Sequence, residues 1–130
     1  MPGTRSQSKN VVDVVSGYSS AAVTAAQVLT EYVAVTFGRL NGIKFLAVTA
    51  GTGGGNTVGD VLVNGTSVWS VGTANKPTLA ATSTGEFASS LPDPASRGIR
   101  PGDRITISVA SVSSTGHARL MASVAIDANA

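Results

Sequence analysis

The sequence predicts an all-β protein, a jelly-roll-like antiparallel β-sandwich of about 7–8 strands. The 130-residue chain is 42% apolar and only 12% charged, with 15 glycines, a composition that suits short strands and tight turns. Short runs of alternating apolar and polar residues recur along the chain, and turns containing Gly, Asn or Pro separate them. Since the chain is too short for two domains, we expect one core.

Residues 1–28 differ from the rest and are predicted to form an extended N-terminal arm, followed by the sandwich domain at residues 29–130. The segment combines a polar leader, the β-prone run VVDVV at 11–15 and a stretch of small residues. A β-prone arm can satisfy its backbone by adding to the edge of a sheet, either its own or a neighbour's. A frayed terminus with a local strand is an equally good interpretation, and a short helix from Ser20 to Glu31 is a weaker one.

The strongest hairpin signal is the Asn-Gly dipeptide at residues 64–65, within GDVLVNGTSVWSV. Both central residues of a type I′ turn need positive φ, which Asn and Gly adopt most readily. This turn sets Val63 opposite Thr66 and places Leu62 and Trp69 on the less aliphatic face of the ribbon. That face is either covered by another segment or available to another subunit.

A second Asn-Gly dipeptide at residues 41–42 predicts another hairpin, between YVAVTFGRL and IKFLAVTA. The register would set Leu40 against Ile43 and Arg39 against Lys44. Like charges facing each other cost up to ~1 kcal/mol. Either this turn lies at a solvent-exposed end of the sandwich, or a bulge shifts the pairing.

The second half of the chain continues the β pattern. The glycine cluster at 51–56 lacks the Gly-Lys-Ser/Thr ending of a phosphate-binding loop and leads into a strand. Residues 82–100 form an irregular loop, with Phe87, Leu91 and Ile99 as expected anchors. Strands are predicted at residues 104–109 and 120–126, where apolar residues alternate with smaller or polar ones.

The sequence offers little for catalysis or metal binding, so we expect neither enzymatic activity nor a cofactor. There is no cysteine and a single histidine. His117 lies in a Ser/Thr/Gly-rich loop and is predicted to be solvated. Asp60, Asp93, Asp103 and Asp127 stand singly near turns or strand ends, and Asp103 is expected to accept hydrogen bonds in the turn after Pro-Gly. A glycosidase pair that converges in space remains a minor alternative.

Charge and hydropathy argue against nucleic-acid and membrane partners. The formal net charge is only +2. Arg97, Arg100 and Arg104 lie close in sequence but lack interleaved aromatic residues that would stack on bases, so a solvated loop is the better interpretation. The polar leader lacks the apolar core of a signal peptide, and no apolar run approaches the length of a membrane span.

Taken in order, DVLVNGTSVW, KPTLAA, a variable loop, PGDRITISVASV and an apolar closing strand resemble small jelly-roll modules of tailed-bacteriophage virion proteins, of the capsid decoration (cement) or head-fibre type. The resemblance covers about residues 32–127. It implies a structural protein that binds the major capsid protein and copies of itself, commonly as a trimer. It implies a place on the outer capsid surface of the virion, after assembly in the host cytoplasm.

The residues expected to contact the capsid or another subunit come from the arm, the less aliphatic hairpin face and the irregular loop: Val11, Val12, Val14, Val15, Tyr18, Leu62, Trp69, Phe87 and Leu91. An alternative function is a receptor- or carbohydrate-binding module associated with a tail or fibre. That alternative predicts that Trp69 or Phe87 lies exposed beside polar groups in a shallow groove.

Overall fold

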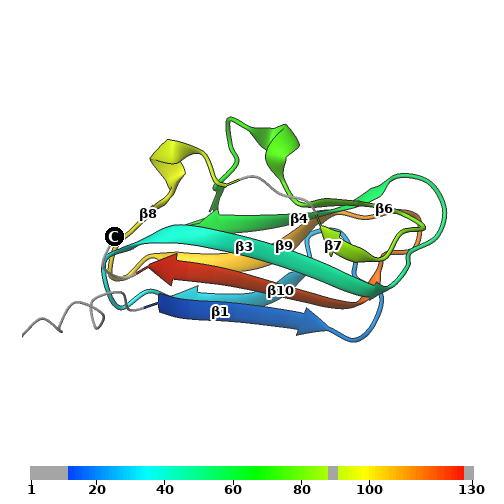
Figure 1. The fold of residues 1–130 in the computed structure, drawn as a ribbon, viewed down its shortest axis with the longest axis horizontal. Coiled ribbons are helices and arrows are strands. Elements are labelled where there is room, and N and C mark those ends of the chain that lie inside the picture. Colours follow the sequence, from blue (N-terminus) through cyan, green and yellow to red (C-terminus); the bar gives the residue numbers. More distant parts are fainter. Residues whose placement is uncertain (1–11, 88–90, 128–130) are drawn as a thin grey trace, which may run out of the picture.

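The computed structural model describes residues 12–87 and 91–127, which form ten strands in two antiparallel sheets (Figure 1). Sheet A has the order β1 (Val12–Ser19), β10 (Ala118–Asp127), β3 (Gly38–Thr49) and β7 (Gly85–Phe87), and β8 (Gly98–Ile99) also pairs with β3. Sheet B has the order β2 (Val28–Val33), β9 (Arg104–Ser111), β4 (Asn56–Val63) and β5 (Thr66–Ser67), and β6 (Thr78–Ala80) also pairs with β4. Two 3₁₀ turns, Thr73–Asn75 and Pro94–Ser96, lie in the connections.

The strand pairing is nested, which is the topology of a jelly roll. β1 pairs with β10, β2 with β9, β3 with β7, and β4 with β6, all antiparallel. The chain therefore folds as one long antiparallel ribbon that wraps around into two facing sheets. The predicted fold class is confirmed, and the additional strands are the two-residue β5 and β8.

The described part of the predicted arm belongs to the sandwich itself, so the boundary at residue 28 needs correction. β1 pairs with β10 along its whole length, from Val12 opposite Asp127 to Ser19 opposite Leu120. The segment adds to the edge of its own sheet, one of the two possibilities left open by the sequence. Residues 28–33 form β2, and no helix forms there. The pairing of the first described strand with the last has no local sequence signal; residues 1–11 lie outside the described part.

The hairpin at residues 64–65 is confirmed. The φ angles there are 52° for Asn64 and 86° for Gly65, and Leu62 pairs with Ser67 as the predicted register requires. β5 ends after Ser67, however, so the ribbon is shorter than expected. The Trp69 side chain leaves the hairpin and lies buried in the core.

The hairpin predicted at residues 41–42 is wrong, because β3 runs straight through them. Neither Asn41 nor Gly42 has a positive φ. Along β10 the partner of Ala125 is Gly42 and that of Ile126 is Leu40, so Asn41 is the extra residue of a β-bulge. The sequence predicts a bulge only as a shift of the hairpin pairing, whereas the observed bulge lies in the pairing of β3 with β10. β3 lies between β10 and the β7 and β8 strands, and pairing on both sides outweighs a local turn preference.

The core lies between the sheets and is built from the inward residues of each strand. Phe45 and Phe87 are fully buried, with ring centroids 5.8 Å apart. A Cβ atom at Gly59 would lie 2.6 Å from the Phe45 ring, so only glycine fits on β4 at this point. The predicted alternation in the strands now labelled β9 and β10 is confirmed, because their inward residues are buried: Ile105, Ile107, Val109, Leu120, Ala122, Val124 and Ile126.

Candidate functional site

Several residues predicted to make contacts do lie on the surface. The side chains of Val14, Tyr18 and Leu91 are exposed by 64%, 55% and 50%, and Leu62 is half-buried. Their contact role stays a prediction. Val12 lies in β1, where its side chain is not described, and Val11 lies outside the described residues.

For Val15, Trp69 and Phe87 the predicted contact role is wrong, because all three side chains are buried in the core. Val15 points inward from β1, next to the outward-pointing Val14. Phe87 packs against Phe45. The indole N–H of Trp69 is buried and has no hydrogen-bond partner within the described part of the chain. Neither aromatic residue offers a platform for a sugar ring.

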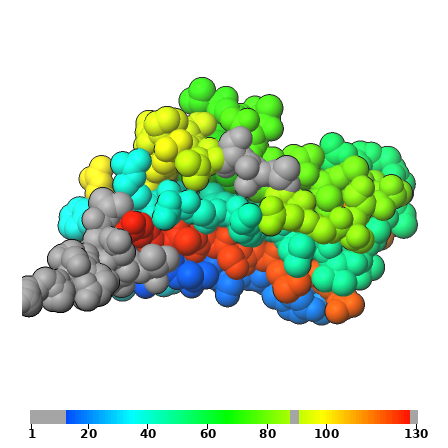
Figure 2. Space-filling model, viewed as in Figure 1, coloured from blue at the N-terminus to red at the C-terminus, as the bar shows by residue number. Residues whose placement is uncertain are grey.

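The outer surface of sheet A carries exposed apolar side chains, which we call the apolar face: Tyr18, Met121, Leu46 and Val48 lie in neighbouring positions, and Val14 lies beyond a polar row on β1. Tyr18 on β1 lies opposite Met121 on β10, which lies opposite Leu46 on β3, so one row crosses three strands. All five side chains are exposed by 39% or more. Figures 1 and 2 view the molecule from this side, and residues of β3, β10 and β1 lie side by side across it.

The next row of this surface is polar but nearly uncharged. Ser16 lies opposite Ser123, which lies opposite Lys44. The Lys44 ammonium forms an ion pair with Glu86 on β7, at 3.2 Å, and both side chains are well exposed. Because the two charges compensate each other, this part of sheet A presents little net charge to a partner.

β1 is also an edge strand. It pairs with β10 on one side, and β2 of the other sheet lies beside it. The contact to β2 is made by side chains: the Tyr32 hydroxyl donates to Asp13 Oδ2 at 3.2 Å, and Leu29 packs close to Gly17. Partial burial, with the Asp13 carboxylate, raises the pKa of Tyr32. No backbone hydrogen bond joins β1 to β2 within the described ranges, so β1 presents backbone groups that another strand can pair with.

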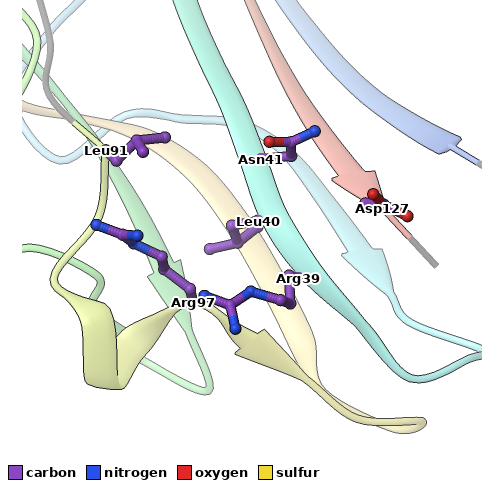
Figure 3. A pocket seen from close by; sticks show the side chains of 6 residues that line it. All are labelled: Arg39, Leu40, Asn41, Leu91, Arg97 and Asp127. Carbon is purple, nitrogen blue, oxygen red and sulfur yellow. The ribbon is translucent and has the colours of Figure 1, made fainter. Parts of the chain in front are cut away.

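A small pocket lies between β3 and the loop that precedes β8 (Figure 3). Its volume is about 100 Å³, and it is lined by Arg39, Leu40, Asn41, Leu91, Arg97 and Asp127. In Figure 3 the side chains of Arg39 and Leu40 extend from β3 toward the loop that carries Leu91 and Arg97, while Asp127 lies on the side of β10. The bulge at Asn41 brings its amide to the rim of this pocket.

The two arginines of the pocket are held differently. Arg97 is half-buried, its Nε donates to Pro92 O at 2.8 Å, and its backbone carbonyl accepts from Leu40 N at 2.8 Å. Arg39 is exposed, and its side chain forms neither a hydrogen bond nor an ion pair with any other described residue. Arg39 also borders a neighbouring open groove of about 430 Å³, together with Phe37, Gly98 and Arg100.

The sequence did not identify this pocket. The sequence predicts a hairpin for Arg39 and Asn41 that does not form, and a solvated loop for Arg97. The one available signal is the repulsion expected between Arg39 and Lys44, which allows either a solvent-exposed turn or a shifted pairing. The long-range contact between β3 and β8, which brings the arginines together, has no counterpart in the local sequence.

His117 is not solvated, in contrast to the prediction. It is fully buried, with Nδ1 2.7 Å from Thr57 Oγ1 and Nε2 2.9 Å from Ser83 O. Because a backbone carbonyl can only accept, Nε2 carries a proton and donates to Ser83 O, and Nδ1 shares a hydrogen bond with the Thr57 hydroxyl. The edge of the ring also contacts Phe87. Both nitrogens are occupied by structural partners, so this arrangement offers no base to a substrate.

The aspartates serve local structure. Asp60 forms a largely buried ion pair with Lys76 at 3.2 Å and accepts from Ser67 Oγ at 2.7 Å. Asp103 Oδ2 accepts from Arg100 N at 2.8 Å, as expected for its turn, and its Oδ1 accepts from Asn64 Nδ2 at 2.9 Å. These hydrogen bonds, with the charge of Arg100, hold the pKa of Asp103 below its ordinary value.

Asp93 Oδ2 accepts from Val71 N at 2.8 Å and from Gly72 N at 3.3 Å, so it fixes the loop after β5. In the part of the chain that the structure describes, no three His, Cys, Asp or Glu side chains are grouped so as to hold a metal ion. The same residues include no helix long and apolar enough to cross a membrane.

Comparison with known proteins yields no relative: no protein-family model, no curated protein and no solved structure matches this chain.

Proposed function

We propose that the protein is a non-enzymatic structural protein of a virus particle, a decoration (cement) protein that binds the outer capsid surface and stabilises the shell. The observation that carries this proposal is the apolar face of sheet A next to the open edge of β1. Interface cores are depleted of charged residues and enriched in aromatic residues and Met, which fits the row of Tyr18, Met121 and Leu46. The jelly-roll topology adds support by fold-level analogy, since viral capsid proteins are among the users of this fold.

Binding would combine two physical contributions. Covering the apolar face removes apolar surface from water, which stabilises a complex by ~25 cal/mol per Å². An extended segment of a neighbour, paired along the edge of β1, adds main-chain hydrogen bonds that give the contact a defined direction. The proposed partners are the major capsid protein and further copies of this chain. A heterologous contact between copies closes into a ring when the rotation between neighbouring copies is a simple fraction of a full turn, and we propose a trimer.

The alternative, a receptor- or carbohydrate-binding module of a tail or fibre, loses the aromatic platforms on which it depended. Trp69 and Phe87 are both buried. Phe37, which is 67% exposed and borders the groove beside Arg39, is an exposed aromatic side chain that could replace them. This observation keeps the alternative as the second candidate.

The experiment that tests the proposal is the location of the chain in virus particles purified from its source. Quantitative mass spectrometry of intact particles, with antibody labelling in electron microscopy, should find the chain in many copies on the outer head surface. Its absence from purified particles would overturn the proposal. Labelling confined to the tail would also overturn it, in favour of the receptor-binding alternative.

A further inference from the structure

We infer that the pocket formed by Arg39 and Arg97 is a binding site for a carboxylate group carried by an acidic segment of a partner protein. This site is separate from the apolar face, and the inference is independent of the virus-particle proposal. It rests on the charge, the size and the walls of the pocket.

The two arginine side chains of the pocket are positively charged, and many of their N–H groups have no partner among the described residues. Arg39 has no side-chain partner among the described residues. Arg97 donates from Nε to Pro92 O, which leaves the N–H groups of its two terminal nitrogens. A guanidinium group offers donors in a planar fork that matches the two oxygens of a carboxylate. In Figure 3 the Arg97 side chain extends toward Leu91 and away from Arg39, so the two guanidinium groups offer donors to an anion from different parts of the pocket.

The pocket is also preorganised on the side of Arg97. The bond from Nε to Pro92 O fixes the direction of the guanidinium group, and the bond from Leu40 N to Arg97 O ties the loop to β3. Binding an anion therefore needs the ordering of Arg39 alone, which limits the entropy cost.

The size of the pocket selects a functional group rather than a whole small molecule. A volume of about 100 Å³ equals the share of roughly three liquid water molecules, whereas sites that enclose a small molecule hold ~300–1,000 Å³. A carboxylate fits this space. The rest of the ligand would extend into the adjoining open groove of about 430 Å³, past Phe37 and Gly98, where a Cβ atom on Gly98 would meet nothing within 4 Å.

The walls of the pocket favour a peptide over a nucleic acid. Leu40 and Leu91 supply apolar walls that suit the methylene groups of a Glu side chain. Asp127 lies at the rim and would repel a polyanion more strongly than a single carboxylate. Binding of nucleic acid usually relies on an extended basic stripe, whereas the formal net charge of this chain is only +2.

The test is a titration of the ¹⁵N-labelled full chain with the peptide acetyl-Gly-Glu-Leu-Glu-Gly-amide, followed by amide chemical shifts. We expect saturable shifts at residues 39–41 and 91–98. Arg39→Gln should weaken the apparent affinity about tenfold and leave the melting temperature unchanged, because the Arg39 side chain supports no described contact. The matched control is Arg119→Gln, an exposed arginine at the opposite end of β10, which should bind the peptide like the wild type.

Two further titrations distinguish the binding of a carboxylate from the binding of an uncharged peptide or of phosphate groups. The same peptide with Gln in place of both Glu residues should cause no shifts at these positions. A short single-stranded oligodeoxynucleotide should bind more weakly than the acidic peptide, and tighter binding at the same residues would overturn the inference in favour of phosphate. The absence of saturable shifts, shifts confined to other residues, or equal losses in Arg39→Gln and Arg119→Gln would also overturn it.

Discussion

The outer surfaces of the two sheets differ in the side chains they carry and in how exposed those side chains are. On sheet B, the outward residues of β9 and β4 are polar and yet buried: Asp60, Thr106 and Ser108 are 6%, 7% and 8% exposed. Two of them have partners within the chain, since Lys76 pairs with Asp60 at 3.2 Å and Thr106 Oγ1 donates to Glu31 at 3.1 Å. On sheet A, the corresponding surface is the exposed apolar face.

This difference indicates which surface is left for a partner. A polar group that is buried must find its hydrogen bonds inside the molecule, and the centre of sheet B has done so. Covering an apolar side chain that is exposed to water lowers the free energy of the system. The centre of sheet B therefore supports the fold, whereas sheet A carries the apolar face from which we infer assembly.

The largest expected effect is the loss of stability when the ion pair between Lys76 and Asp60 on sheet B is broken, in comparison with the exposed ion pair on sheet A. Lys76→Ala should lower the free energy of unfolding by about 2–3 kcal/mol, because it leaves the Asp60 carboxylate buried without its counterion. Lys44→Ala removes the exposed pair with Glu86 on sheet A and should cost less than about 1 kcal/mol. Urea unfolding of both variants measures the difference. Equal losses would contradict the contrast between the sheets.

The second prediction concerns assembly. Tyr18→Asp places a charge on the apolar face and should weaken self-association about tenfold or more, measured by sedimentation equilibrium. The free energy of unfolding should change by less than about 0.5 kcal/mol. The control is Val71→Asp, which introduces the same charge at a side chain that is 87% exposed in the loop after β5. If both variants associate like the wild type, the apolar face is not the contact surface.

The third prediction uses the two Asn-Gly dipeptides, one in each sheet. Gly65→Ala in sheet B should destabilise by about 1 kcal/mol, because the φ of 86° is unfavourable for an L-residue with a Cβ atom. Gly42→Ala in sheet A should be close to neutral, since its φ is not positive and the nearest neighbour of its Cβ would be Ala125 at an ordinary 3.9 Å. Thermal unfolding of the two variants compares them directly. A larger loss for Gly42→Ala would refute the bulge as described.

The smallest expected effect is a pH dependence at the end of sheet B. The pKa of Asp103 is lower in the folded chain than its ordinary value. Its stabilising contribution is therefore present above about pH 4 and is lost as the pH falls through the lowered folded value. Asp103→Asn should make the fall of the melting temperature between pH 5 and pH 2 less steep. An unchanged slope would show that Asp103 does not contribute.

Much of the fold could be predicted from local patterns. The alternation in residues 104–109 and 120–126 identified β9 and β10 and their buried faces, and the hairpin at residues 64–65 formed in the predicted register. The predictions that were wrong concern residues whose partners are distant in the sequence. β1 was assigned to an arm because its partner, β10, lies at the other end of the chain, and His117 was assigned to solvent because Thr57 and Ser83 are remote in sequence.

The candidate sites were predictable only in part. Val14 and Tyr18 were expected to be contact residues and lie on the apolar face, but Met121, Leu46 and Val48 joined them only through strand register. Leu91 was expected to be a contact residue and lines the arginine pocket, but Arg39 and Arg97 were not connected. Register and loop placement depend on the whole sandwich, so these groupings could not be derived from one segment.

The sequence by itself determined the β class, the inward residues of the final strands and the one turn that requires two positive φ angles, because period-two alternation and turn geometry are properties of neighbouring residues. The tertiary structure decided which strands pair, whether an Asn-Gly dipeptide turns or bulges, and which side chains meet at the surface. The reason is that main-chain hydrogen bonds on both sides of β3 outweigh the modest preference of two residues for a turn.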